Sequence, residues 1–271
     1  MDLFNFSKGK RKEEEEPAMP KTEREVPQPI NEEAVIEVRR PQLKSNSLYC
    51  ETVRDVDGNV YNTLIVGKQI WIVENLKTTK YNDGTPINLI IDDVKWKDYS
   101  FSIEGAYCWY ENNISNKAKY GALYNWYAVK TGNLAPVGWR VPSEWDWAEL
   151  ENYLVANGYN YDRTISGNKI GKSLAAQTDW KSSSDVGDVG NDTSTNNSTG
   201  FSALPGGCRS DDGNFLSRFI LGCWWSSTQS GLDYETVSAC MTYLHHDACD
   251  LYRGSYDMKF GFSVRVVRNL D

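Results

Sequence analysis

Residues that could bind a metal ion or act as nucleophiles are concentrated in the C-terminal third of the sequence. Both histidines, His245 and His246, and four of the six cysteines occur between positions 208 and 249. The run Cys240-x4-His245-His246-x2-Cys249 supplies thiol and imidazole groups, which are zinc ligands. Its spacing matches no standard zinc finger or ribbon, and the sequence contains no Cys-x-x-Cys pair. We therefore expect free thiols, without a bound metal ion or any other cofactor.

The composition argues against several classes of partner. The formal net charge is −8, whereas nucleic-acid binding relies on clustered Lys and Arg, so we do not expect a nucleic-acid partner. No apolar run approaches the ~18 residues that a membrane span needs. The first residues, MDLFNFSKGKRKEEEEP, lack the apolar segment of a secretory signal. We expect synthesis in the cytoplasm, where structural disulfides are rare, and leave open transport in a phage particle or by another export route.

Residues 1–45 differ in composition from the rest of the chain. They are rich in charged residues and proline, and such a segment cannot bury enough apolar surface to offset the entropy of ordering. We predict a flexible N-terminal arm, which could attach the protein to a larger assembly or join copies of it into a homo-oligomer. Residues 46–271 are rich in aromatic side chains and are predicted to form one domain.

Local patterns predict the elements of this domain. The Asp57-Gly58 turn lies between alternating apolar residues and predicts a hairpin over residues 52–61. A turn at Gly67-Lys68 leads into a strand over residues 69–73. Residues 120–129 have helical spacing, with Leu123, Trp126 and Tyr127 on one face.

A second helix is predicted from Ser143, which is a good N-cap residue with Asp146 three positions later. Trp147, Leu150 and Leu154 form its apolar stripe. Short strands and long polar loops follow, including the Ser, Asp, Asn, Thr and Gly stretch at 182–199. The fold class expected is α+β, with two helices, short antiparallel strands and long loops.

Eight phrases, in order, carry a resemblance to a known family. They are WIVENL (71–76), NDGTP (82–86), AYCWY (106–110), YGALYNWY (120–127), GWRVPS (138–143), GFSALPGG (200–207), WWSST (224–228) and GFSVR (261–265). Over residues 52–269 the chain resembles the Fibrobacter succinogenes major paralogous domain. The resemblance implies a C-type-lectin-like fold, whose two ends come together and whose loops form a ligand-binding face. The chain has Ala135 and Val266 where the family usually has cysteine.

The C-terminal third also resembles the variable proteins of diversity-generating retroelements. Small or aromatic residues such as Gly207, Gly222 and Trp224 form a regular frame, and chemically unrelated residues lie between them. In those proteins adenines are mutated in codons for surface residues, and a Tyr codon changed at its middle adenine encodes Cys. The resemblance therefore implies that the scattered cysteines are part of a diversified surface.

On this interpretation the domain binds a ligand and is not an enzyme. A broad patch of mixed side chains suits a protein partner better than a small molecule. Trp224 and Trp225 are adjacent in a predicted strand, so one is expected to face outward. The predicted ligand-binding residues are Cys208, Ser210, Asn214, Leu216, Arg218, Phe219, Leu221, Cys223, Trp225, Tyr234, Thr236, Ser238, Cys240, Thr242, Leu244, His245, Asp250, Tyr252, Arg253 and Tyr256.

Other functions stay open. GWRVPSEWDW (138–147) is similar to a phrase of formylglycine-generating enzymes, which need a pair of active-site cysteines that hold copper. A calcium-dependent sugar site could use the oxygens of Glu111, Asn112 and Asn113 or of Asp211 and Asp212, but neither group forms a recognisable calcium loop. An adhesin or carbohydrate-binding module of fixed specificity would show an ordered calcium ion or a groove lined by tryptophan.

Overall fold

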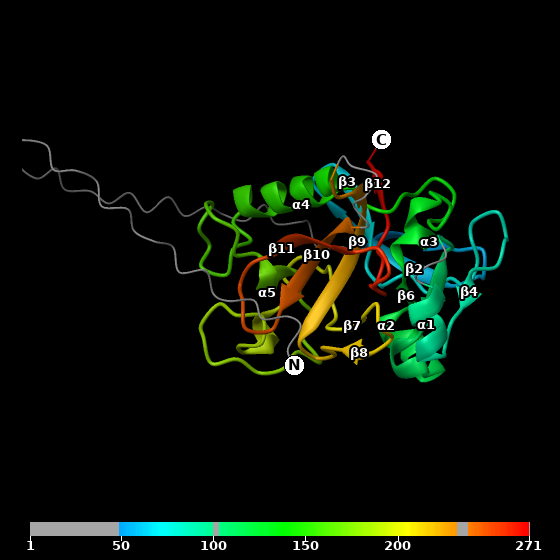
Figure 1. The fold of residues 1–271 in the computed structure, drawn as a ribbon. Helices are drawn as coiled ribbons and strands as arrows, with labels where there is room; N and C mark the ends of the chain where they lie inside the picture. The colour runs from blue at the N-terminus through cyan, green and yellow to red at the C-terminus, as the bar shows by residue number, and fades with distance from the viewer. Residues whose placement is uncertain (1–48, 100–102, 232–237, 271) are drawn as a thin grey trace, which may run out of the picture. The chain divides into compact units, whose positions relative to one another are not determined.

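The computed structural model describes residues 49–99, 103–231 and 238–270. The chain divides into two units, residues 1–37 and 38–271, and every described residue belongs to the second. The arm predicted over residues 1–45 lies outside the described residues. So do Tyr234 and Thr236 of the predicted ligand set. The described part is a mixed α/β domain with several antiparallel sheets and few helices (Figure 1).

The first sheet joins the two ends of the described domain. It contains β1 (Tyr49–Arg54), β2 (Val60–Val66), β3 (Gln69–Ile72) and β12 (Val267–Asn269), which are antiparallel and in this order. Asp55 Oδ1 accepts hydrogen bonds from the backbone N–H groups of Asp57 at 3.0 Å and Asn59 at 2.9 Å, which fixes the turn between β1 and β2. The predicted hairpin and the strand after Gly67 are confirmed.

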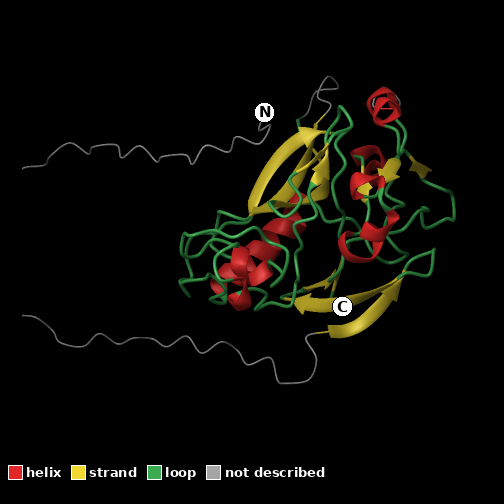
Figure 2. Cartoon of the chain, turned by 90° about the horizontal axis from the view of Figure 1, so that it is seen from below, coloured by secondary structure: helices red, strands yellow, loops and turns green. Residues whose placement is uncertain are grey.

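The second sheet is formed by the C-terminal third of the chain. Its antiparallel strands are β9 (Leu221–Gln229), β10 (Ser238–His245) and β11 (Tyr252–Asp257), with β10 in the centre. A short ribbon of β7 (Cys208–Arg209) and β8 (Phe215–Leu216) lies beside β9, which it meets through a bridge between Gly207 and Gly222. Figure 2 shows the two larger sheets on opposite sides of the domain.

A third, smaller sheet is surrounded by most of the short helices. It contains β4 (Asn88–Leu89), β5 (Ala106–Cys108) and β6 (Leu123–Tyr124). Around it lie α1 (Asp93–Tyr99), the 3-10 turns η1 (Tyr110–Asn112) and η2 (Ile114–Asn116), α2 (Lys117–Tyr120) and α3 (Trp126–Lys130). The described ranges therefore contain more helices than the two predicted, although only α4 is longer than seven residues.

The single helix predicted over residues 120–129 is wrong. The segment contains the end of α2, strand β6 and α3. Gly121 ends α2 at a positive φ of 74°, and a side chain there would meet Asn75 Cβ and Leu76 O at 2.7 Å. Asn125 then caps α3, because its side chain accepts a hydrogen bond from Ala128 N at 3.1 Å.

The predicted second helix is confirmed as α4 (Glu144–Ala156). Ser143 and Asp146 form a capping box, in which each side chain accepts a hydrogen bond from the other residue's backbone N–H. Trp147, Leu150 and Leu154 are buried, as the stripe predicts. This helix packs against β2, β9 and β10, so it lies between the two larger sheets.

The main core joins these layers. Trp71 of β3 packs against Trp147 of α4 with ring centroids 4.7 Å apart, and Trp224 of β9 lies 6.4 Å from Trp147.

The polar segment 182–199 contains the 3-10 turn η3 (Thr193–Thr195), and the short helix α5 (Gly171–Leu174) contains Lys172. The buried Lys172 ammonium donates to the carbonyl oxygens of Asp188 and Asp192, each at 3.3 Å, and also to that of Asn191.

Candidate ligand-binding face

Three tyrosines lie together on one face of the second sheet. In the strand register Tyr243 of β10 lies opposite Tyr252 of β11, and Tyr256 follows four residues later on the same face of β11. The rings of Tyr243 and Tyr252 are stacked, with centroids 5.0 Å apart and planes 14° apart. Tyr256 packs edge-on against Phe260 at 5.3 Å. Tyr252 and Tyr256 are half-buried, so their rings reach solvent, and we call the three residues the tyrosine patch.

Two cysteines lie beneath this patch. Cys223 is opposite Tyr243 in the register, and both Cys208 and Cys223 are fully buried. Burial raises the pKa of each thiol, and the neighbouring Cys208 raises that of Cys223 further. Burial also raises the pKa of Tyr256, together with the adjacent Cys223, Tyr243 and Cys208. Both thiols therefore stay protonated at neutral pH, which makes them poor nucleophiles and poor metal ligands.

The other two cysteines lie elsewhere. Cys240 is on the opposite face of β10, and burial and the nearby Glu144 raise the pKa of its thiol. Cys249 follows β10 in a loop, where burial and a hydrogen bond to Asp250 raise its pKa to about 12. The four cysteines thus occupy three different environments, and all are free thiols in the structure.

Arg218 lies next to the tyrosine patch together with Tyr110, Glu111 and Phe219, and we call these four residues the arginine cluster. The guanidinium carbon of Arg218 is 4.8 Å from the ring centroid of Tyr110 and 4.9 Å from that of Phe219, and its Nη1 is 3.3 Å from Glu111 Oε2. Phe219 is 41% exposed. The backbone here is unusual, because Glu111, Ser217 and Phe219 have positive φ values of 53°, 62° and 71°. Bulky residues rarely adopt this conformation, and such strain is concentrated at functional sites.

Close backbone packing joins the arginine cluster to the sheet. Gly207 has a φ of 68°, and a Cβ there would lie 2.7 Å from Arg218 N and 2.8 Å from the Tyr110 ring. Gly207 N donates to Leu221 O at 2.9 Å, at the start of β9. Its neighbour Cys208 lies close to Tyr256 of the tyrosine patch. Only glycine permits this approach, so Gly207 holds the two parts of the site side by side.

The buried side chain of Arg209 holds the segment that contains Gly207 and Arg218 against the rest of the domain. Its fully buried guanidinium donates to Gly213 O at 3.0 Å, to Ile90 O at 2.6 Å and to Asp93 Oδ1 at 2.6 Å. Its Cζ lies 4.5 Å from the Trp96 ring centroid and 4.8 Å from that of Phe215. The hydrogen bonds and ring contacts satisfy a charge that would otherwise be costly to bury.

Five predicted ligand residues lie on the other face of the second sheet. Alternation along β10 turns these side chains toward α4, where Arg253 forms an ion pair with Glu151. Leu244 belongs to the main core, and Thr242 is fully buried opposite Trp224. A ligand on the tyrosine patch cannot touch this face, because a strand presents its two faces to opposite sides. The five residues are Ser238, Cys240, Thr242, Leu244 and Arg253.

Five further predicted residues, Cys208, Ser210, Leu221, Cys223 and Trp225, are buried and so cannot contact a ligand at the surface. Trp225 packs on Phe262 with centroids 4.4 Å apart and donates its indole N–H to Tyr124 O at 2.8 Å. Trp224 is also buried, with its indole N–H donated to Asn75 Oδ1 at 2.8 Å. The expectation that one of the two adjacent tryptophans faces outward is therefore wrong, because residues 258–263 and α3 cover the second one.

The remaining predicted residues lie around the tyrosine patch and the arginine cluster. His245 ends β10 on the same face as Tyr243, and Asp250 adjoins Tyr252. Leu216 is half-buried opposite Cys208, and Asn214 is exposed in the turn before it. We use the term display face for the outward set of Leu216, Arg218, Phe219, His245, Tyr252 and Tyr256.

Two members of the arginine cluster, Tyr110 and Glu111, are absent from the predicted ligand set. They lie more than a hundred positions before Arg218 in the chain. Their sequence signals point to other roles, because Tyr110 belongs to a family phrase and Glu111 opens a polar turn. Only the fold brings them to this surface.

A groove lies over α4 and the β2–β3 turn. It is lined by Gly67, Lys68, Trp145, Ala148, Glu149, Asn152 and Tyr153. Trp145 is 84% exposed, which is exceptional for so large an apolar side chain. The groove therefore offers an aromatic ring beside charged and amide groups.

The comparisons with known proteins give one positive result. No curated protein matches the chain, and no solved structure matches it. Among the described residues, no helix is both long enough and apolar enough to cross a membrane. The model of the Fibrobacter succinogenes major domain family matches residues 65–268, which is most of the chain. The chain therefore belongs to the Fibrobacter succinogenes major domain family.

Proposed function

We propose that this chain is a ligand-binding variable protein of a diversity-generating retroelement, and that its partner is another protein. The observation that supports this most is the contrast between the display face and what lies under it. Trp224, Trp225, Arg209 and Phe262 are fully buried, and we call these four residues the frame. Over that frame the display face carries aliphatic, aromatic, cationic and imidazole side chains with no common chemistry.

The side chains of the display face suit protein recognition. Tyrosine provides a large contact area with few rotatable bonds, so little conformational entropy is lost on binding. The stacked Tyr243 and Tyr252 rings hold each other in place, which lowers that loss further. Arg218, fixed between two rings, adds a charge whose direction is set before binding. Rigid aromatic anchors and arginine are the typical hot spots of protein interfaces.

We also propose that the scaffold is C-type-lectin-like. Its first and last described strands belong to one sheet, which agrees with a fold whose ends come together. The role assigned to it is binding without catalysis. The high pKa values of the four C-terminal thiols argue against a nucleophilic cysteine.

A pair of displayed libraries tests the proposal. The first randomises the six positions of the display face, and the matched control randomises Ser238, Cys240, Thr242, Leu244 and Arg253 on the opposite face. Both are sorted for folding and then for binding to a panel of folded proteins. The display-face library should keep mostly folded members and yield binders, while the control library should lose folding. Equal loss of folding in the two libraries would refute a display role.

The groove at Trp145 supports a second candidate, a carbohydrate-binding module of fixed specificity. An exposed indole can stack on the apolar face of a sugar ring while Asn152, Glu149 and Lys68 bond its hydroxyls. A glycan array separates the two candidates. Glycan binding that is lost in Trp145→Ala but kept in a Tyr252→Ala variant would favour the carbohydrate module.

A further inference from the structure

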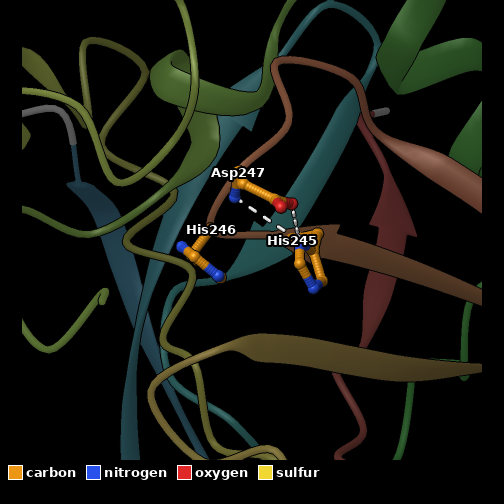
Figure 3. A group of neighbouring side chains, drawn as sticks. All are labelled: His245, His246 and Asp247. Atoms are coloured by element: carbon orange, nitrogen blue, oxygen red, sulfur yellow. Dashed lines mark hydrogen bonds and ion pairs between the residues drawn. The ribbon is translucent and has the colours of Figure 1, made fainter. Parts of the chain in front are cut away.

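Two histidines and an aspartate meet at the turn that follows β10. Their ligand atoms all lie within 4.8 Å of one another, and they form the one such group of three or more metal-binding side chains within the described ranges. Figure 3 shows the three side chains gathered at this turn. The ring centroids of His245 and His246 are 4.9 Å apart. Cys240 and Cys249, which flank the two histidines in the sequence, are not members of the group.

The backbone of the turn is fixed from both sides. His246 N donates to Ile220 O at 3.0 Å, and His246 O accepts a hydrogen bond from Gly190 N at 2.7 Å. Ala248 N donates to His245 O at 3.3 Å and closes the turn. The positions of the two histidine Cβ atoms are therefore set before any ion binds, which reduces the entropy lost on binding.

His245 and Asp247 are already in contact. His245 Nδ1 bonds to Asp247 Oδ1, and Asp247 N also approaches Nδ1 at 3.4 Å. The two contacts need opposite tautomers of the His245 ring. The shorter contact is to the Asp247 carboxylate, which can only accept a hydrogen bond, so this contact places the proton on Nδ1. If a metal ion replaces this proton, His245 Nδ1 and Asp247 Oδ1 must lie about 3 Å apart, because metal–nitrogen bonds are about 2.1 Å long. The Asp247 side chain is 48% exposed and can turn to open that space.

His246 supplies the third group and has an unmet hydrogen-bonding need. It is 9% exposed, and its Nδ1 is buried without a hydrogen-bond partner in the described part of the chain. A buried polar nitrogen left without a partner lowers stability. Because its Nδ1 has no hydrogen-bond partner among the described residues, the His246 ring has a nitrogen to offer to an ion at the turn.

The geometry points to a binding site for a divalent first-row transition-metal ion, of the zinc or nickel class, at His245, His246 and Asp247. Imidazole favours such ions over calcium or magnesium, which prefer oxygen ligands. With three protein ligands, the remaining positions would be filled by water, as in sites that are not purely structural. The site shares His245 with the display face, but metal binding does not depend on what that face binds.

Titration of the full chain with Zn²⁺ by calorimetry tests the site directly. We expect one ion per chain at micromolar free metal. His245→Ala and Asp247→Asn each remove or weaken one of the three ligands, and each should weaken binding by at least tenfold. His246→Gln should abolish binding, and its melting curve checks that this buried position still folds. Asp250→Asn is the matched control and should bind Zn²⁺ normally.

Free thiols also bind Zn²⁺, so a second readout identifies the ligands. The Co²⁺ complex should lack the near-ultraviolet thiolate-to-cobalt band, and Cys240→Ser and Cys249→Ser should keep full affinity. Failure of the unaltered chain to take up metal at millimolar Zn²⁺ would overturn the proposal. So would affinity unchanged in His245→Ala, or a thiolate band that disappears in a Cys→Ser variant.

Discussion

The ring of Tyr243 stacks on the ring of Tyr252 in the neighbouring strand β11, and on its other side Tyr243 is paired in the register with the buried Cys223 of β9. One partner, Tyr252, reaches solvent, and the other is almost covered. The pair therefore stands at the boundary between the frame and the display face. Residues on the two sides of this boundary should respond differently to mutation.

Removal of a display-face ring should affect stability little. Tyr252→Ala should lower the free energy of unfolding by about 1 kcal/mol, since a stacked aromatic pair contributes about 0.5–1.5 kcal/mol. Trp225→Ala, in the frame, should cost about 3–5 kcal/mol because it leaves a cavity. Urea denaturation of both variants measures the difference. A cost for Tyr252→Ala as large as that for Trp225→Ala would mean that the tyrosine patch is part of the frame.

The strain at Phe219 gives a second prediction. At its φ of 71°, Phe219→Gly should be about 1 kcal/mol more stable than Phe219→Ala, because alanine keeps the left-handed strain and glycine does not. At Phe215, in strand β8, the order should reverse, and this pair is the matched control. Chemical denaturation of the four variants gives the comparison. If alanine is the more stable replacement at both positions, the backbone at Phe219 is not strained.

Among single residues, Arg209 should contribute most to the stability of the loop that carries Arg218. Arg209→Met leaves the carbonyl groups of Ile90 and Gly213 without their donor and should cost about 3–5 kcal/mol. Asp93→Asn removes only the ion pair to a side chain that is 64% exposed and should cost at most about 1 kcal/mol. Thermal melts rank the two variants. Similar losses would show that the ion pair, and not the carbonyl contacts, holds Arg209.

Alkaline pH should destabilise the domain. Burial raises the pKa of Cys108 from the usual 9.0 to about 12, despite the nearby Arg209. Between these values the unfolded chain has lost the proton and the folded chain has kept it, so stability falls as pH rises. Burial likewise raises the pKa of Tyr243 to about 12. Unfolding free energies measured from pH 8 to 11 should decline, with a shallower slope in Cys108→Ala. An identical slope in this variant would remove Cys108 from the explanation.

Local sequence signals predict the elements that depend on near neighbours. The N-cap at Ser143 and the turn at Asp57-Gly58 depend on contacts within four residues, and both predictions are confirmed. The segment 120–129 fails because Gly121 must pack against Asn75, which lies far away in the chain. No local pattern shows that contact.

The same limit applies to the site. The sequence indicates the correct stretch, but a strand exposes only alternate residues, so Thr242 and Leu244 lie in the core while Tyr243 adjoins the surface. Which set of alternate residues faces outward depends on the packing of α4 against β9 and β10, and this packing joins residues far apart in the sequence. Trp225 is buried for a similar reason, since residues 258–263 cross over it.

The DNA sequence of the locus around codons 205–265 tests the central claim most directly. We predict a nearby imperfect repeat that differs from these codons only at adenines, beside a reverse transcriptase gene. The differences should fall on display-face codons such as those of Arg218, Phe219 and Tyr256, and should spare the frame codons of Arg209, Trp224 and Phe262. A locus without such a repeat, or with differences spread equally over frame and display codons, would contradict the proposed function.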